Sequence, residues 1–303
     1  MTDVLQRSQT EPLSLRPGSR RTGEAISPME VVPGLGTDLA ATLDWAVRIG
    51  RDAPLPGRGE TARLWAMLAE AARVDVGAAR VLEPHLDALA ILAQAGDAGI
   101  DAAAALGAVG ADDEASWGVF AAEGPGVRLE ATQDPGGAWS LNGVKPWCSL
   151  AGRLSHALVT AWVTPEMRGL FAVPLRAPGV EAHDGPWVAR GLSQIVSAPV
   201  GFRAVGAVPI GEPGWYLSRP GFAWGGIGVA AVWWGASIPL RDALVAAAGR
   251  DGADQLASYY AGAADSLLWA ARAVLSESAD AVDAGPGMSD GDMVRIGSRA
   301  RAV

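Results

Sequence analysis

The spacing of apolar positions along the chain begins with a helical stretch. From Thr37 onward apolar residues recur at every third or fourth position, which predicts a helix capped by Thr37. Residues 60–96 keep the same spacing and predict a long helix pair, with Pro84 at a kink or junction. We therefore expect an all-helical domain over residues 37–114.

The spacing changes near Ala115 to an alternation of two. Turn-forming residues, including residues 134–137 and the Asn142-Gly143 pair, separate short runs with this alternation or with continuous apolar character: WGVFAAEG, VRLEATQ, AWSLNGVKPW, HALVTAWVT, GLFAVPL and GVEAHD. No helical stretch intervenes, so the pattern predicts a small antiparallel β-barrel or sheet over residues 115–211.

Helical spacing returns in the last third of the chain. It predicts two long helices, over residues 221–248 and 253–282, and the start of a third after them. The sequence stops in mid-pattern at RIGSRARAV, so we expect residues 212–303 to form an incomplete helical bundle. Residues 1–36 lack periodic apolar positions and predict a disordered extension. The expected fold class is α+β multidomain: helical domain, small antiparallel β-barrel or sheet, and C-terminal bundle.

An uncharged run over residues 220–240 is long enough to cross a membrane. It contains several glycines and Pro239, and no second span accompanies it, so a buried bundle helix is the better interpretation. Gly226, Gly228 and Ala231 match a dinucleotide-binding turn, but no strand precedes them. Close helix packing explains these small residues better, and we expect no membrane span.

Charge and cysteine content exclude several classes of protein. The chain has 33 acidic and 24 basic residues and a net charge of -9, which disfavours nucleic acid as a partner. Its single cysteine cannot form an internal disulfide, and three scattered histidines indicate no metal site. The N-terminal residues lack the apolar core of a secretory signal, so we expect a cytoplasmic protein.

Two possible reactive groupings lie in the predicted sheet. Cys148 and His156 could form a nucleophile and base, but no orienting acid is recognisable, and neighbours in a sheet are the stronger interpretation. Trp147 lies two positions before Ser149 at a strand end. An indole beside a hydroxyl can stack on a planar heterocycle and bond its polar edge, although Trp147 could equally be a core residue.

This segment and the order of the elements resemble the acyl-CoA dehydrogenase family over residues 37–303. The family lines the flavin ring of FAD with two stretches of its β domain. The second, a Gly-x-Lys turn followed by Trp-x-Ser/Thr, is matched by Gly143, Lys145, Trp147 and Ser149.

The family's first flavin-lining stretch is matched only in part. Phe120 and Ala122 fit its opening and Pro125 is retained, but Glu123 and Gly124 stand where the family has Thr and Glu. The resemblance implies FAD as cofactor and five flavin-contacting residues: Phe120, Ala122, Glu123, Trp147 and Ser149.

The resemblance also implies an activity, the α,β-dehydrogenation of acyl-CoA or another acyl thioester in lipid metabolism. An electron-transfer flavoprotein would accept the electrons, and the chain would form a homo- or hetero-oligomer. No catalytic carboxylate is recognisable at the expected positions, so we expect impaired activity. Two alternatives stay open: a catalytically degenerate flavin-binding or partner-binding homologue, such as the non-catalytic subunit of a heteromer, and a membrane-anchored binding protein using residues 220–240.

Overall fold

The computed structural model describes residues 12–16, 32–182, 187–285, 290–299 and 302–303. Internal contacts divide the chain into two compact units. Unit 1 comprises the described residues of 1–36, 54–79 and 223–303, and unit 2 comprises those of 37–53 and 80–222. Each unit combines separate segments of the chain, so this division does not test the domain boundaries expected at residues 36, 114 and 211. Those boundaries stay predictions.

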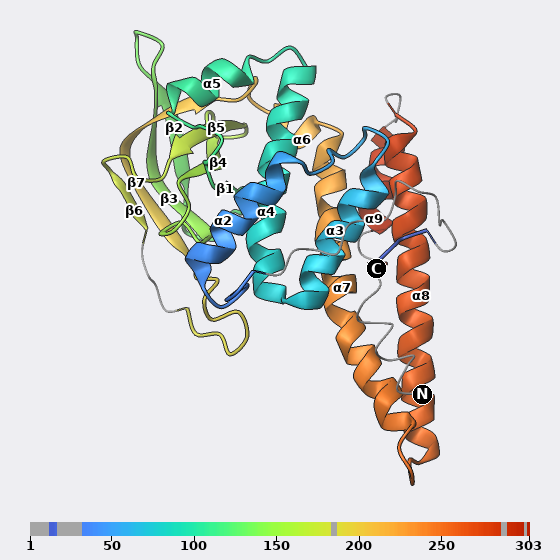
Figure 1. The fold of residues 1–303 in the computed structure, drawn as a ribbon. Coiled ribbons are helices and arrows are strands. Elements are labelled where there is room, and N and C mark those ends of the chain that lie inside the picture. Colours follow the sequence, from blue (N-terminus) through green and yellow to red (C-terminus); the bar gives the residue numbers. More distant parts are fainter. Residues whose placement is uncertain (1–11, 17–31, 183–186, 286–289, 300–301) are drawn as a thin grey trace. The chain divides into compact units, whose positions relative to one another are not determined.

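Unit 2 contains a closed barrel of five strands, and two further strands pair with it (Figure 1). The ring runs β2–β3–β7–β5–β4 and closes from β4 back to β2, while β1 pairs with β4 and β6 with β7. The strand bounds are β1 Trp117–Phe120, β2 Leu129–Gln133, β3 Trp139–Ser149, β4 His156–Trp162, β5 Arg168–Pro174, β6 Val180–Ala182 and β7 Ser197–Pro209.

The expected antiparallel sheet is wrong, because β4 pairs in parallel with both β1 and β2. The β2–β3 hairpin lies between β1 and β4 in the sequence, so β1 and β4 are not joined by a tight turn. This connection lets the two strands run in the same direction. The fold is a mixed α+β fold in which helices pack directly on the barrel. It is not an isolated sheet between two helical domains.

The longest strand, β7, lies at the centre of these pairings. It contacts β3, β5 and β6, although the glycines and prolines of residues 197–209 gave no strand prediction. The turn expected at Asn142-Gly143 is also wrong. Gly143 lies inside β3 at an irregularity with φ +120°, where a Cβ would collide with the carbonyl oxygen of Arg128.

Helices cover one side of the barrel within unit 2. They are α2 (Leu39–Arg51), α4 (Val76–Asp97, whose first four residues belong to unit 1), α5 (Ala102–Ala108) and the short α6 (Trp215–Ser218). Asp38, and not the expected Thr37, caps α2 by accepting hydrogen bonds from two backbone amides. Ile91 and Leu92 of α4 pack in one buried core with Trp117, Leu158 and other barrel residues.

Unit 1 consists of helices, α3 (Thr61–Val74), α7 (Gly221–Ala248, from residue 223), α8 (Gln255–Asp283) and α9 (Asp290–Arg299). The two long helices predicted over residues 221–248 and 253–282 are confirmed. Asp283 accepts hydrogen bonds from the amide and hydroxyl of Thr61, which fixes the end of α8 to the start of α3. Trp234 donates through Nε1 to the carbonyl of Leu268, 3.0 Å away, and links α7 to α8.

Helix α7 is the one described helix long and apolar enough to cross a membrane. Half of its most apolar window is buried in the structure, and a core helix satisfies the same criterion, so the helix is weak grounds for a membrane protein. Gly228 lies against Leu68 and Trp65 of α3, as expected for close helix packing, whereas Gly226 faces open space.

Candidate functional site

An exposed tryptophan projects from a bulge in β3. Lys145 pairs with Val200 of β7 and Cys148 pairs with Ala198, so β3 has one extra residue between these pairs. Pro146 lies in this interval and has no N–H to donate to the ladder. Trp147 adopts φ +57° and is 63% exposed, between the buried Pro146 and Cys148. The bulge therefore presents the indole on the outside of the barrel.

Two hydroxyl groups lie next to this bulge. Ser149 and Ser197 are paired across β3 and β7, and their Oγ atoms are 2.6 Å apart. Both residues are partly exposed, so each hydroxyl can take a further hydrogen-bond partner. Cys148 is 1% exposed, and burial raises the pKa of its thiol to about 12. A thiolate nucleophile at Cys148 is thus excluded at neutral pH.

A second group of side chains lies at the end of the barrel where β4 ends and β5 begins; we call Glu123, Lys145, Trp162 and Arg168 the rim cluster. Oε1 of Glu123 accepts from Lys145 Nζ at 2.6 Å and from Arg168 at 3.0 Å. Oε2 accepts from Trp162 Nε1 at 3.1 Å. Lys145 also donates to the hydroxyl of Thr160, 2.8 Å away in the barrel interior.

Burial and charge act against each other in the rim cluster. Burial raises the pKa of Glu123, but the hydrogen bond and charge of Lys145, with the hydrogen bonds of Trp162 and Arg168, hold that pKa below its usual value. Burial lowers the pKa of Lys145, and the hydrogen bond and charge of Glu123 oppose the change. Glu123 is therefore ionised at neutral pH and accepts three hydrogen bonds, two at Oε1 and one at Oε2.

Cations also lie over the ring of Trp162. The guanidinium carbon of Arg128 is 4.3 Å from the ring centroid and that of Arg168 is 5.4 Å away. Arg128 further pairs with Glu130 at 3.1 Å. These contacts fix the indole plane of Trp162 at the barrel end.

The structure brings the two predicted flavin-lining stretches together. The Lys145–Glu123 ion pair joins them, and a Cβ at Gly124 would lie 3.3 Å from the ring of Pro146. Ala122 is exposed in the loop after β1, but Phe120 is 3% exposed and belongs to the core. Of the predicted flavin contacts, Phe120 is therefore a buried side chain with little surface for a ligand to contact.

Sequence reasoning did not identify Thr160, Trp162, Arg168 or Ser197 as members of the site. They lie on β4, β5 and β7 and meet the predicted stretches only through the barrel closure. One signal was available for the rim cluster: Lys145 is the only lysine of the chain and lies inside a strand that is otherwise largely apolar.

Other titratable groups of unit 2 are buried away from the rim cluster. His85 accepts a hydrogen bond at Nδ1 from the amide of Trp117, and burial lowers its pKa to about 4. Glu83 is 9% exposed, and burial raises its pKa to about 7. His156 contacts Ser155 and the carbonyl of Val109, while His183 lies outside the described residues. The part of the chain that the structure describes contains no cluster of three His, Cys, Asp or Glu residues suited to a metal.

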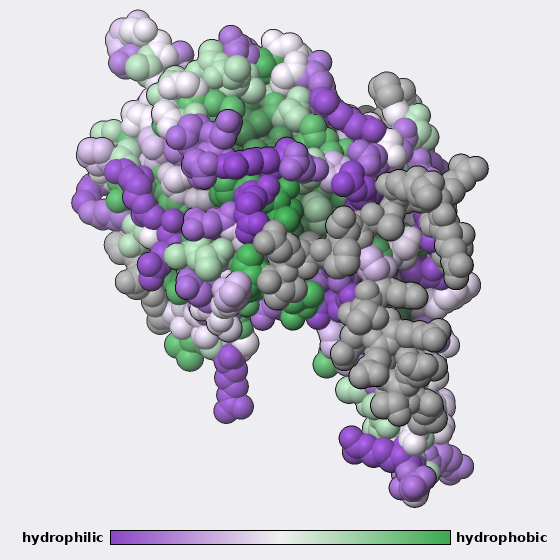
Figure 2. All heavy atoms as spheres, viewed as in Figure 1, coloured by the Kyte–Doolittle hydropathy of each residue, from purple (hydrophilic) through white to green (hydrophobic). Residues whose placement is uncertain are grey.

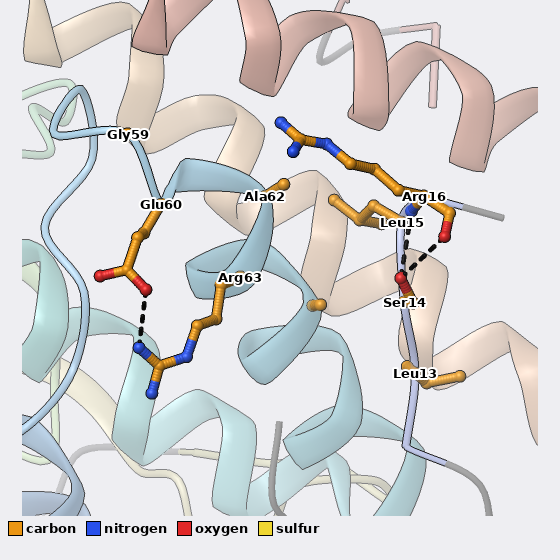
Figure 3. A pocket seen from close by; sticks show the side chains of 9 residues that line it. Leu13, Ser14, Leu15, Arg16, Gly59, Glu60, Ala62 and Arg63 are labelled. Carbon is orange, nitrogen blue, oxygen red and sulfur yellow. Dashed lines mark hydrogen bonds and ion pairs between the residues drawn. The ribbon is translucent and has the colours of Figure 1, made fainter. Parts of the chain in front are cut away.

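Two hollows in the structure lie elsewhere. In unit 1 the segment 12–16 packs beside α3 around a cavity of about 40 Å³, with Leu15 buried and Arg16 paired with Asp280 (Figure 3). This volume holds a few water molecules, whereas small-molecule sites enclose roughly 300–1,000 Å³. In unit 2 a shallow hollow of about 720 Å³ is lined by Ala, Gly, Pro and Val residues and Trp139, without a titratable group. Neither hollow is lined by a residue of the rim cluster.

No protein-family model and no curated protein matches this sequence. Solved structures share its fold. KijD3, in complex with FMN and dTDP-3-amino-2,3,6-trideoxy-4-keto-3-methyl-D-glucose, superposes with a TM-score of 0.66 and 20% identity over 91% of this chain and 80% of that one. FMN-bound TdsC from Paenibacillus sp. A11-2 superposes with a TM-score of 0.64 and 18% identity, over 79% of this chain and 68% of that one. The methanesulfinate monooxygenase MsuC from Pseudomonas fluorescens superposes with a TM-score of 0.63 and 18% identity, over 91% of this chain and 82% of that one.

These structures correct the family expected from the sequence. The similar proteins are FMN complexes and a monooxygenase, so the assignment to the acyl-CoA dehydrogenase family is wrong. The order of helices and barrel and the Gly-x-Lys…Trp stretch belong to a fold that hosts more than one activity, and fold does not determine reaction. The acyl thioester and electron-transfer flavoprotein expected with that family remain untested predictions.

Proposed function

We propose that this chain binds a flavin at the barrel end beside Trp147 and acts as a flavin-dependent oxidoreductase of the monooxygenase type. The observation that carries the proposal is the exposed indole of Trp147 in a left-handed backbone conformation. The shared fold supports it, since KijD3 and TdsC were solved with FMN and MsuC is a monooxygenase.

The conformation of Trp147 is costly unless the exposed ring has a use. A bulky residue with positive φ stores on the order of 1–3 kcal/mol of backbone strain. A tryptophan with a purely structural role would recover such a cost through burial, as Trp45 and Trp65 do at 1% exposure or less. Trp147 recovers little, because 63% of it faces solvent. A planar ligand stacked on the indole accounts for both the strain and the exposure.

The polar groups around Trp147 fit the edge of a flavin ring. The pyrimidine edge of a flavin carries carbonyl acceptors and one imide N–H donor. Ser149 and Ser197 share one hydrogen bond in which either can be the donor, so one of their hydroxyl protons can be offered to a flavin carbonyl. The carboxylate of Glu123 can accept a hydrogen bond from an imide, and its side chain is 31% exposed. Trp147, Ser149, Glu123 and the exposed Ala122 are the residues that would hold the ring. FMN is the form of flavin we propose, in place of the FAD expected from the sequence.

When bound and reduced, the flavin supplies the two electrons with which one atom of O₂ enters the substrate and the other leaves as water. The chain itself orients the ring. Trp147 would cover one face of the ring and Ser149 would bond one polar edge, while the donors from Lys145, Trp162 and Arg168 hold the Glu123 carboxylate ionised in one place. Because Lys145 is buried, its charge acts through Glu123 and not by direct contact with solvent.

A second candidate function has a specific observation in its favour. Within the rim cluster and the β3 bulge, the titratable groups are engaged or buried: Glu123 accepts three hydrogen bonds and Cys148 is a buried thiol. Neither group is a free general base that could move a proton to or from a substrate. The chain would then bind flavin without turnover, as a non-catalytic subunit.

Turnover with reduced flavin separates the two functions. The purified full chain is supplied with FMN, a flavin reductase with NADH, O₂ and a panel of sulfides, sulfinates and amines, and products are analysed by mass spectrometry. Our proposal predicts a product that is one oxygen atom heavier than its substrate. The Trp147→Ala variant should form less product at limiting FMN and regain it at excess FMN. Flavin binding without any product supports the non-catalytic subunit, and failure to bind flavin contradicts both functions.

A further inference from the structure

A short segment near the N-terminus packs on unit 1 without joining any described helix or strand. Residues 12–16, which we call the N-terminal segment, have no regular secondary structure. Residues 12–15 form no hydrogen bond between backbone groups with any other described residue. Even so, Leu15 is 2% exposed. Contacts with side chains of unit 1 therefore hold the segment in place (Figure 3).

Small residues surround the buried side chain of Leu15. Gly59, Ala62 and Ala66 line, together with Leu15, the cavity of about 40 Å³. Ala62 and Ala66 lie four positions apart and therefore share one face of α3. Alanines leave room beside a helix that a longer side chain from another segment can fill. Leu15 fills most of this room, because the cavity that remains holds only a few water molecules.

An acid contacts each end of the N-terminal segment. Oε2 of Glu70 on α3 accepts a hydrogen bond from the amide of Leu13 at 3.3 Å. Glu70 is 4% exposed and is also paired with Arg73. Oδ1 of Asp280 on α8 pairs with Nη2 of Arg16 at 2.5 Å. The two acids and the small residues of α3 thus fit a segment that offers an amide, an apolar side chain and a cation in this order.

Asp280 differs from three other acids of the α7–α8 pair. Asp265 is paired with Arg241. Asp251 and Asp254 lie at the exposed tip between the two helices, where Figure 2 shows hydrophilic residues. The cation of a segment that is anchored on α3 therefore meets Asp280, near the C-terminal end of α8. We call the residues that contact the segment the docking face: Gly59, Ala62, Ala66, Glu70 and Asp280.

These contacts are too few to hold the segment permanently. Leu15 is its one fully buried side chain. The side chains of Arg16 and Asp280 are 36% and 61% exposed, and ion pairs this exposed contribute little to stability. Ordering five residues costs conformational entropy at each of them. Because the contacts and the entropy oppose each other and are similar in size, docked and released forms should exchange.

We infer that the docking face is a binding site for a peptide with the pattern Leu-x-Leu-Arg, and that the chain's own N-terminal segment occupies it reversibly. The segment is the occupant because it supplies this pattern at Leu13, Leu15 and Arg16. A tethered segment has an effective concentration on the order of 1 mM, so a free peptide must approach this concentration to displace it. On release, the buried side chain of Ala66 becomes open to another peptide with this pattern.

Thiol reactivity in the full chain tests this inference. Leu15→Cys keeps an apolar side chain at the anchor, and Ser14→Cys places a thiol on the exposed neighbouring residue as the matched control. The native Cys148 adds little background, since it is 1% exposed and burial raises the pKa of its thiol to about 12. A thiol-specific disulfide reagent should react at least about five-fold more slowly with Leu15→Cys than with Ser14→Cys, and urea should make the two rates equal.

Competition by a free peptide tests whether docking is reversible. A capped peptide of residues 12–16 at about 1–10 mM should bring the rate of Leu15→Cys to within about two-fold of the control. The same peptide with Asp in place of Leu15 should have no effect. Adding Asp280→Asn should raise the rate of Leu15→Cys about two-fold, and high salt should do the same, because both weaken the ion pair with Arg16.

Circular dichroism of each variant shows that it is folded. Equal native rates for Leu15→Cys and Ser14→Cys would mean that the segment does not dock. Protection that about 10 mM peptide leaves unchanged would make the segment a fixed part of unit 1, which also overturns the inference. Relief of protection by the Asp-containing peptide would show that the docking face does not recognise the pattern.

Discussion

Nζ of Lys145 lies 2.6 Å from Oε1 of Glu123, and this ion pair joins two segments 22 positions apart at the barrel end. Its partners differ in burial: the lysine side chain is 1% exposed and the glutamate side chain 31%. Removing the glutamate leaves a buried ammonium with only the hydroxyl of Thr160, whereas removing the lysine leaves a carboxylate that water, Arg168 and Trp162 still solvate.

This asymmetry predicts unequal effects of two substitutions. Glu123→Ala should lower the free energy of unfolding by about 2 kcal/mol, less than the 3–5 kcal/mol of a fully buried pair because Glu123 is partly exposed. Lys145→Met keeps the apolar stem and should cost below about 1 kcal/mol. Urea unfolding at neutral pH measures both. Equal losses would contradict the assignment of the buried charge to Lys145.

The Glu123→Ala variant should also have its own pH dependence. Without Glu123 the folded-state pKa of Lys145 falls further below its unfolded value, since burial remains and the opposing charge is gone. The unfolded chain then binds more protons, so stability rises as the pH increases from 7 to about 10. The loss relative to wild type should shrink over this range, and a constant loss would show that Lys145 does not titrate there.

Two buried groups on α4 have pKa shifts of opposite sign. The pKa of Glu83 is raised from 4.5 to about 7, so stability falls as the pH rises through this interval. The pKa of His85 is lowered from 6.5 to about 4, so stability rises with pH through that interval. The two slopes oppose each other between about pH 4.5 and 6.5.

Single substitutions should therefore expose one slope each. Relative to wild type, Glu83→Gln should gain stability from pH 4.5 to 7, by at most about 3 kcal/mol, and His85→Gln should gain stability from pH 6.5 down to 4 by a similar amount. Denaturant unfolding across the pH range measures both differences. A pH-independent difference for either variant would mean that the group does not titrate as its burial implies.

Two glycines of α7 provide a matched test of helix packing in unit 1. A Cβ at Gly235 would lie 2.6 Å from the Cα and carbonyl carbon of Ala69, so Gly235→Ala must displace α3 and should cost about 2–3 kcal/mol. A Cβ at Gly226 meets open space, so Gly226→Ala should stabilise by about 0.5–1 kcal/mol through helix propensity. Thermal unfolding measures the pair, and equal shifts would contradict the close approach of α3 and α7.

The elements that sequence predicted well are those fixed by local pattern. The helices α7 and α8 follow from apolar spacing and from the Gly and Pro residues that bound them. Strand β7 was missed because Pro199, Gly201 and Gly206 disfavour a strand locally, and its pairing with β3, β5 and β6 stabilises it from outside the segment. The parallel partners of β4 depend on barrel closure, which no local pattern encodes.

The residues of the candidate site also fall into two groups, those predicted from the local sequence and those brought in by strand pairing. Trp147 and Ser149 were predicted as flavin contacts because the local segment from Gly143 to Ser149 resembles a flavin-lining stretch, and this assignment stays a prediction. Their exposure results from the β3 bulge and from pairing with β7, which the sequence pattern did not show. Arg168 and Trp162 reach Glu123 from β5 and β4, so their role depends on contacts between residues about 40 positions apart.

The measurement that tests the flavin site most directly is a titration of the full-length protein with FMN, followed by flavin fluorescence, in three forms. We expect the wild type to bind FMN and Trp147→Ala to bind it about five-fold more weakly, which corresponds to about 1 kcal/mol for one stacking face. Trp269→Ala, which removes an indole of the same 63% exposure from α8, should bind as the wild type does. Equal affinities of wild type and Trp147→Ala, or no binding by the wild type, would contradict a flavin site at Trp147.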